Sequence, residues 1–230
     1  MKQTTAPIQR INDFVVKFAN VNGSGSASAN LLFAKSILRM GIPVAPRNIF
    51  PSNIQGLPTW FEVRVNEAGW RGRRGGVDLM VAMNPQTWDQ DLKEIEPGGY
   101  LFYDSTRQLP ASMFRDDITV IGMPLTEICN REYTDSRQRQ LFKNIVYVGA
   151  LSALLEIEPE VIAEVNGRQA RRRGRGRRHR GAGRVTLWSA PPASRPEALT
   201  RAATVQLAAI RQAIYRDAFL SADPLHSVVA

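Results

Sequence analysis

Hydrophobic residues follow strand-like and then helix-like spacing near the start of the chain. Residues 14–21 are mostly β-branched or aromatic and run into Asn22-Gly23, which predicts a strand that ends in a turn. In residues 29–40 the apolar positions recur at helical spacing and Gly41 follows them, which predicts a helix. A strand, a glycine turn and a helix in this order are typical of the opening of a βαβ unit.

The alternation continues to about residue 165. Further strands are predicted at residues 43–45, 60–65, 77–83, 100–104 and 118–121, and helices at 84–95, 137–155 and 160–165. Asn84-Pro85 and Asp135 are the expected helix starts. This order predicts an α/β fold, a Rossmann-like three-layer sheet with helices on both faces.

Two finer expectations concern exposure. In residues 60–65 apolar and charged residues alternate, which predicts one solvent-facing side for that strand. The loop over residues 48–59 is rich in Pro, Gly and Asn but carries Ile, Phe and Leu, which predicts that it packs against something instead of lying free in water.

Charge divides the chain of 230 residues into two parts, although its net charge is +9. Residues 1–165 contain 17 Lys and Arg against 18 Asp and Glu, whereas residues 166–230 contain 13 Arg, no Lys and three acids. We therefore predict a folded domain over residues 12–165 and a disordered or irregular Arg/Ala-rich tail over residues 166–230. Composition of this kind is typical of an out-of-frame translation of a GC-rich gene, so the tail is not expected to be a native domain. Resequencing the locus tests this interpretation.

The scarcity of cysteine and histidine excludes several kinds of site. Cys129 is the single cysteine, which excludes an intramolecular disulfide and an iron–sulfur cluster held by this chain alone. It follows Ile128 and is interpreted as a small buried hydrophobic residue. Residues 1–165 contain no histidine, so no metal site is predicted there.

A membrane location is not predicted. The longest apolar run, residues 145–155, is about half of the length that spans a bilayer, and the N-terminus has no apolar signal core. We expect a cytoplasmic protein without a membrane partner.

The turn Gly23-x-Gly25-x-x-Ser28 is the main candidate for ligand binding. Glycines allow backbone N–H groups to approach a phosphate closely, and the following helix offers the positive end of its dipole. The third position is Ser instead of Gly, which weakens the match to a dinucleotide-binding turn. Binding of a nicotinamide dinucleotide and simple packing of strand on helix both stay open at this point.

Two other groups of polar residues carry weaker signals. Asp78 and Asp104 each lie near a strand end and are interpreted as solvated acids instead of paired catalytic carboxylates. The basic turn over residues 71–76 is interpreted as a solvated hairpin, with contact to acidic phosphates or to a neighbouring subunit as the alternative.

Several separated segments resemble one known family. Residues 21–30, 50–60, 77–86, 124–132 and 139–144 resemble, in this order, the gamma domain of 2-oxoacid:ferredoxin oxidoreductases. The last two segments favour the form of that domain that is fused to the N-terminus of the 2-oxoglutarate-type alpha subunit. The resemblance covers about residues 14–165, and we expect the family's chain to be truncated or frameshifted after that point.

The resemblance implies a function that this chain does not perform alone. Such enzymes oxidatively decarboxylate a 2-oxoacid, here 2-oxoglutarate, to an acyl-CoA and reduce ferredoxin. The expected partners are the thiamine-binding alpha and beta parts of the enzyme, with ferredoxin reached through the complex. Thiamine diphosphate, magnesium and iron–sulfur clusters would lie on those parts, since this sequence has no Gly-Asp-Gly motif for thiamine. No catalytic residue is therefore assigned here.

In that family the gamma domain is associated with coenzyme A. The resemblance thus implies that the glycine turn and the loop after residue 51 bind coenzyme A or form an interdomain face, with both choices open. The residues concerned are Gly23, Ser24, Gly25, Ser26, Ser52, Asn53, Gln55 and Gly56.

A second interpretation assigns the chain to a different class of protein. In this interpretation it is a free-standing Rossmann-like binding protein whose basic tail binds nucleic acid. Arg-Gly runs contact phosphates without sequence preference. Residues 168–184 contain nine arginines but no aromatic residue that could stack on bases. Nucleic acid is therefore not the expected partner.

Overall fold

The protein is built around a six-stranded mixed sheet. The computed structural model describes residues 7, 10–51, 54–158, 160–162, 164–165 and 186–187. The strands are β2 (Asp13–Val21), β3 (Val44–Ile49), β4 (Pro58–Asn66), β5 (Val77–Ala82), β6 (Ile95–Asp104) and β7 (Thr119–Met123), in the order β3-β4-β2-β5-β6-β7. The strands β2, β5, β6 and β7 run parallel to one another, whereas β4 runs antiparallel to both of its neighbours, β2 and β3. A short antiparallel pair is formed by β1 (Arg10–Ile11) and β8 (Thr186–Leu187).

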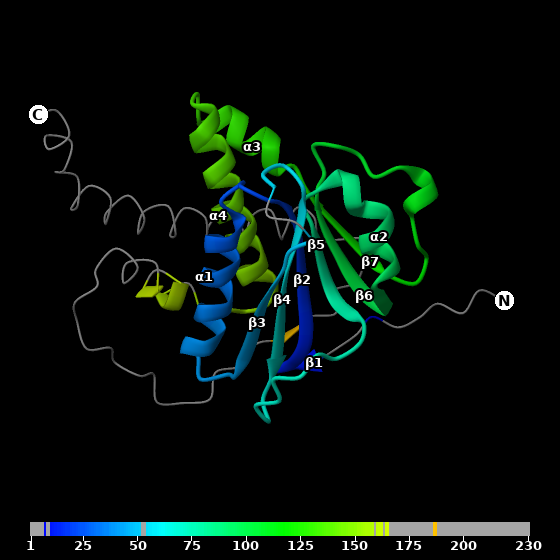
Figure 1. Ribbon diagram of the computed structural model, residues 1–230, viewed down its shortest axis with the longest axis vertical. Helices are drawn as coiled ribbons and strands as arrows, with labels where there is room; N and C mark the ends of the chain where they lie inside the picture. Colours follow the sequence, from blue (N-terminus) through cyan, green and yellow to red (C-terminus); the bar gives the residue numbers. More distant parts are fainter. Residues whose placement is uncertain are drawn as a thin grey trace, which may run out of the picture.

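Helices cover both faces of the sheet (Figure 1). One face carries α1 (Ser26–Arg39), α3 (Leu125–Glu132) and α4 (Ser136–Leu154). The other carries α2 (Trp88–Lys93), with the short 3-10 turns η1 (Pro85–Thr87) and η2 (Ala111–Met113) beside it. The predicted α/β fold with helices on both faces is confirmed.

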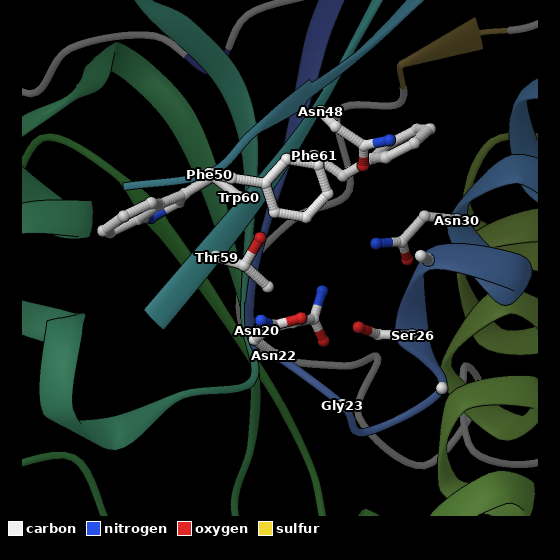
Figure 2. Close-up of a pocket in the computed structure, with 12 residues that line it drawn as sticks. Asn20, Asn22, Gly23, Ser26, Asn30, Asn48, Phe50, Thr59, Trp60 and Phe61 are labelled. Carbon is white, nitrogen blue, oxygen red and sulfur yellow. The ribbon is translucent and has the colours of Figure 1, made fainter. Parts of the chain in front are cut away.

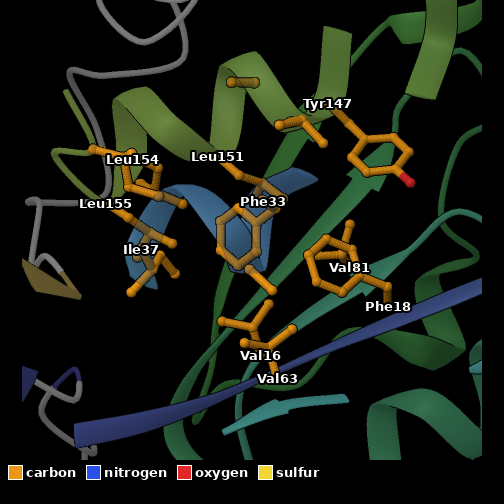
Figure 3. Close-up of a cluster of buried hydrophobic side chains, with 14 of the residues drawn as sticks. Val16, Phe18, Phe33, Ile37, Val63, Val81, Tyr147, Leu151, Leu154 and Leu155 are labelled. Atoms are coloured by element: carbon orange, nitrogen blue, oxygen red, sulfur yellow. The ribbon is translucent and has the colours of Figure 1, made fainter. Parts of the chain in front are cut away.

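Aromatic side chains form the centre of the larger core (Figure 3). The Phe18 ring of β2 lies edge-on to Phe33 of α1 and Phe61 of β4, with ring centroids 5.3 and 6.3 Å apart. Tyr147 of α4 lies 6.0 Å from Phe18, and its hydroxyl donates to Asn30 Oδ1 at 2.6 Å. Because these contacts join α1 and α4 to the strands, they fix the position of the α1 N-terminus above the sheet.

Element boundaries mostly agree with the sequence patterns. Asp135 caps α4 by accepting from the backbone N–H of Gln138, as predicted. The helix predicted at residues 84–95 is divided into η1 and α2, and β6 begins at Ile95, five residues before the strand predicted at residues 100–104. The helix α3 was not predicted, because it has only eight residues; Leu125, Ile128 and Cys129 lie at helical spacing, but so short a segment shows less than one repeat of the pattern.

The prediction of a solvent-facing side for residues 60–65 is wrong. Glu62 and Arg64 are only 5% and 8% exposed, because the segment after β4 lies over this face of the sheet and ion pairs neutralise both charges. Arg73 donates to Glu62, with Nη2 3.1 Å from Oε2, and Arg74 pairs with the buried carboxylate of Asp78. The turn over residues 71–76 is thus tied to the sheet instead of forming the solvated hairpin predicted.

The packing predicted for the apolar loop over residues 48–59 is not provided by the described part of this chain. Phe50, Ile54 and Leu57 are 49%, 64% and 40% exposed, so the packing of this loop against another body stays a prediction. Ser52 and Asn53 lie outside the described residues.

Several expectations concern residues beyond the part of the chain that the structure describes. The predicted disordered tail falls on residues 166–230, of which only 186–187 are described, so the domain boundary and the reading-frame interpretation stay predictions. Among the described residues, no helix has the length and hydrophobicity needed to cross a membrane. The same residues bring together no group of three or more His, Cys, Asp or Glu side chains suited to hold a metal ion.

Asp91 of α2 is a fully buried carboxylate that is held by neutral donors. Its Oδ1 accepts from Trp60 Nε1 at 2.8 Å, and its Oδ2 accepts from the Thr87 hydroxyl at 2.6 Å. The charged neighbours Lys17 and Glu94 have opposing effects on it. Burial raises the pKa of Asp91 above its ordinary value, because the charged form is poorly solvated there.

We expect the free energy of unfolding of Asp91→Asn, relative to that of the native protein, to increase with pH. The increase should begin near the ordinary pKa of aspartate and be complete above the raised pKa of Asp91 in the folded protein. Above the ordinary aspartate pKa of about 3.9 the unfolded chain has lost its proton while the folded chain still holds one, so ionisation lowers native stability as the pH rises. Asparagine keeps both hydrogen bonds, since its oxygen accepts from Trp60 and its NH2 group donates to Thr87. Urea unfolding at a series of pH values measures the difference; a difference that is the same at every pH contradicts this expectation.

Candidate functional site

A cavity of about 370 Å³ lies where β2 passes through the glycine turn into α1 (Figure 2). It lies between the first turn of α1 and the ends of β3 and β4 that adjoin the turn. Ligands of open α/β sheets bind at the carboxyl ends of the parallel strands, which is where this cavity lies. Its lining consists of Asn20, Asn22, Gly23, Gly25, Ser26, Ala27, Asn30, Asn48, Phe50, Thr59, Trp60 and Phe61.

The glycine turn has the backbone conformation that its sequence predicts. Gly23 and Gly25 have φ angles of +83° and +78°, a region that residues with a Cβ rarely adopt. Asn22 anchors the turn to the following loop, because its N–H donates to the carbonyl of Leu57 at 2.8 Å and its own carbonyl accepts from Gly56 N at 3.0 Å. The turn and the loop therefore form one hydrogen-bonded unit at the cavity.

Most of the predicted site residues meet here. Gly23, Gly25 and Ser26 line the cavity. The Ser24 hydroxyl lies 3.1 Å from that of Ser26, and the Gln55 side chain packs against Gly23. Gly56 contributes its backbone hydrogen bond, whereas the predicted Ser52 and Asn53 lie outside the described residues. The structure therefore joins the described candidates from both predicted segments in one place.

The helix α4 holds the other side of the glycine turn. Asn144 Nδ2 donates to the carbonyl of Ser24 at 2.8 Å, and Asn144 is only 3% exposed. A Cβ built on Gly25 would lie 2.9 Å from Leu141 Cδ2. These two contacts fix the turn from a helix that begins more than 100 residues later in the chain.

Two features of the cavity lining suit a hydrogen-bonding ligand. The N-cap residue of α1 is Gly25, which has no side chain to accept from the first N–H groups, and the first turn of the helix contains no acid. Such a helix end attracts anions. Asn20 is 3% exposed and lines the cavity, and its side chain also interacts with the Tyr147 hydroxyl.

Several lining residues were missed by sequence reasoning. Asn48 and Thr59 come from the antiparallel strands β3 and β4, and Asn30 lies one turn inside α1. The end of the first parallel strand could have indicated Asn20, since side chains there adjoin ligands in this class of fold. No local signal in the sequence places β3 and β4 beside that strand end.

The remaining candidates have other roles. Asp78 is fully buried beneath Arg74, near the start of β5, and Asp104 ends β6 and accepts from the Thr126 hydroxyl at 2.5 Å. The prediction that both acids are solvated is therefore wrong. They lie at opposite ends of the parallel strands β5 and β6, so they do not form a pair of carboxylates. Cys129 is 1% exposed, and burial raises the pKa of its thiol to about 11, so its interpretation as a buried hydrophobic residue is confirmed.

Comparison with known sequences identifies relatives. The profile of the family "Pyruvate ferredoxin/flavodoxin oxidoreductase" matches residues 15–176. Subunit alpha of 2-oxoacid:ferredoxin oxidoreductase 2 from Aeropyrum pernix is 29% identical over 82 residues, which are 36% of this chain and 13% of that protein. The 2-oxoglutarate synthase subunit KorC from Archaeoglobus fulgidus is 23% identical over 159 residues, or 68% of this chain and 79% of KorC. The chain therefore spans most of KorC but only a small part of the longer alpha subunit.

Solved structures show the same fold at low sequence identity. The 2-oxoglutarate:ferredoxin oxidoreductase from Magnetococcus marinus, with 2-oxoglutarate, coenzyme A and succinyl-CoA bound, matches with a TM-score of 0.64 and 20% identity over 93% of this chain and 32% of that one. The gamma subunit of a keto/oxoacid ferredoxin oxidoreductase from Geobacter sulfurreducens matches with a TM-score of 0.55 and 16% identity, over 86% of this chain and 99% of that subunit. Since the family profile matches more than half of the chain and agrees with the fold, the chain belongs to the pyruvate ferredoxin/flavodoxin oxidoreductase family.

Proposed function

We propose that this chain is the gamma part of a 2-oxoacid:ferredoxin oxidoreductase and is inactive without its partner parts. Its length relative to KorC and to the Geobacter gamma subunit supports this role. The proposed enzyme converts a 2-oxoacid, with 2-oxoglutarate preferred, to an acyl-CoA and reduces ferredoxin. Thiamine diphosphate, magnesium and the iron–sulfur clusters belong to the partner parts in this proposal.

The contribution of this chain is to bind coenzyme A in the cavity at the glycine turn. The observation that carries this proposal is the N-terminus of α1, which has no side-chain cap and opens into the cavity beside the buried Asn20 amide. Both offer donors and neither carries a charge that could take part in proton transfer. The cavity is thus suited to hold and orient a ligand instead of reacting with it.

The apolar loop beside the cavity supports contact with the thiamine-binding parts. Phe50, Ile54 and Leu57 are exposed on the loop, and Leu141 of α4 is 50% exposed next to the glycine turn. Large exposed apolar groups in one region are typical of interfaces. A partner that covers them would also close the mouth of the cavity.

Reconstitution tests the proposed function. The full chain is produced with and without the remaining alpha and beta parts, and coenzyme A-dependent reduction of ferredoxin by 2-oxoglutarate is followed. We expect turnover only when the chain and its partner parts are both present. Full activity of the partner parts without this chain, or turnover by this chain alone, contradicts the proposal.

A further inference from the structure

The two edges of the sheet are protected to different degrees. An edge strand presents unpaired N–H and C=O groups, and proteins commonly block such an edge with proline or with charged side chains. The edge strand β3 carries Pro46 and Arg47 near its middle. The edge strand β7, at the opposite end of the sheet (Figure 1), has the sequence Thr-Val-Ile-Gly-Met, without proline or charge. The β7 edge is therefore the one that is open to pairing.

The outer side of β7 has no partner in the part of the chain that the structure describes. The strand pairs with β6 alone, in parallel register from Thr119 to Met123. Residues 119–122 take part in no other hydrogen bond to a described residue. Alternate residues of a strand direct their backbone groups away from a single neighbour, so these groups are available to a further strand.

The side chains of β7 show that the two cores reach this edge without being closed there. Ile121 is partly buried against the larger core, and Ile118 and Val120 are partly buried against the smaller core on the other face. By contrast, all six residues of β5 in the middle of the sheet are buried. A strand added outside β7 would therefore cover apolar side chains on both faces of the sheet.

We propose that β7 pairs in solution with β7 of a second copy of this chain, antiparallel, so that one sheet runs through both copies. A two-fold axis perpendicular to the sheet relates two identical strands in this way and keeps each core on its own face. Directly opposite residues point to the same face, so the axis passes through a residue. The register that pairs all five residues places Ile121 opposite itself, Thr119 opposite Met123 and Val120 opposite Gly122.

The charges at this edge are compatible with such a pair. Like charges directly opposite each other destabilise antiparallel strands, and this register contains no charged residue. The amino end of β7 follows Asp116 and Asp117, whereas its carboxyl end leads into the N-terminus of α3. In an antiparallel pair these two ends adjoin, so the acids of one copy lie near the positive end of the α3 dipole of the other.

The termini of the described chain do not reach this edge. The first and last described strands, β1 and β8, pair with each other, at Arg10–Ile11 and Thr186–Leu187. Arg10 Nε lies 3.4 Å from Asp78 Oδ1 on β5, and β6 separates β5 from β7. A second copy offers an identical open edge, which makes it the occupant that we assign.

Sedimentation velocity of the full chain at increasing concentration tests the proposal. High salt in the buffer suppresses non-specific contacts of the arginine-rich tail. Pairing of two short edges belongs to the small and weak class of interfaces, so we expect a reversible equilibrium that moves from monomer to dimer between micromolar and millimolar concentration. A chain that stays monomeric over this whole range overturns the proposal.

A charged variant with a matched control locates the interface. Ile121→Lys should weaken dimerisation at least about tenfold, because two cations would lie opposite each other on the two-fold axis. Val44→Lys places the same charge at a partly buried apolar position of the β3 edge and should leave dimerisation unchanged. Circular dichroism checks that both variants fold. An unchanged dimer in Ile121→Lys, or equal loss in the two variants, contradicts the assignment to β7.

Cross-linking gives a second measurement that does not depend on a tolerated lysine. Opposite residues of antiparallel strands have Cα atoms about 4.5–5.5 Å apart, which is within the range of about 4.4–6.8 Å for disulfides. Mild oxidation should therefore join two copies of Ile121→Cys, whereas Val44→Cys should stay uncrosslinked. The native Cys129 is 1% exposed and should not react in either variant. Cross-linking through Val44→Cys and not through Ile121→Cys overturns the proposal.

Assembly with the thiamine-binding parts distinguishes a second copy from a strand of those parts. If β7 pairs with itself, Ile121→Cys should also join two copies of this chain in the reconstituted enzyme. If the chain alone is monomeric and Ile121→Lys prevents its assembly with the partner parts, β7 pairs with a strand of those parts and the second-copy proposal is wrong. The proposal does not rest on the proposed function, since absence of ferredoxin reduction leaves the sedimentation and cross-linking results unaffected.

Discussion

Replacement of Asp78 by alanine is expected to lower the free energy of unfolding by about 3–5 kcal/mol. The Asp78 carboxylate is fully buried and pairs with Arg74, while Arg10 Nε lies 3.4 Å from its Oδ1. It also accepts from the backbone N–H of Val15 at 2.8 Å, which joins β5 to β2. Removal of the carboxylate leaves the partly buried Arg74 and a buried strand N–H without their acceptor, and both losses destabilise the native state.

The matched control for this variant is Asp89→Ala. Asp89 pairs with Lys93 four residues later on α2, at 3.1 Å, but both side chains are about three quarters exposed. An exposed pair of this kind contributes about 0.3–0.5 kcal/mol. Urea unfolding of the full chain measures both variants, and an Asp78→Ala loss as small as that of Asp89→Ala would show that the buried pair does not hold β2 to β5.

The burial of Asp78 could not be predicted from the sequence, although the strand that carries it was. The run of apolar residues from 77 to 83 indicates a buried strand, and β5 confirms it. Whether an acid in such a run is solvated depends on what covers the sheet. Here the cover is the segment with Arg73 and Arg74, which folds back over the strands through ion pairs. That placement is set by tertiary contacts, not by spacing along the chain.

The candidate site shows a similar division. The glycine turn could be predicted because Gly23 and Gly25 occupy positions that need positive φ angles, and this requirement is local. The two strands that complete the cavity could not be predicted, since β4 runs antiparallel between β2 and β3 and brings Thr59 beside Asn20. Strand order is a property of the whole sheet.

The exposed loop shows where hydrophobic patterning misleads. Phe50, Ile54 and Leu57 have the composition of core residues, which is why the sequence predicts that they pack. Hydrophobicity gives the tendency of a side chain to leave water but does not say whether its cover is the same chain, a ligand or a partner. Their exposure in the structure is the reason that we place them at an interface in the proposed enzyme.

We expect Gly25→Val to abolish detectable binding of coenzyme A to this chain. Gly25 has a φ of +78°, and a Cβ there would lie 2.9 Å from Leu141 Cδ2. It also lines the cavity at the N-terminus of α1, so a branched side chain would occupy the space beside the N–H groups that the ligand needs. The strained backbone is expected to cost about 1–3 kcal/mol of stability in addition.

Gly69→Val separates the two effects of that substitution. Gly69 has the same φ of +78°, but no atom lies within 4 Å of the position of its Cβ, and it does not line the cavity. Valine at residue 69 should therefore impose similar backbone strain and leave ligand binding intact. Calorimetric titration and urea unfolding of both variants test this difference. If both variants lose binding to the same degree, the loss reflects general destabilisation, and the glycine turn is not the ligand site. If only Gly25→Val loses binding, the cause is the closure of the cavity at the start of α1.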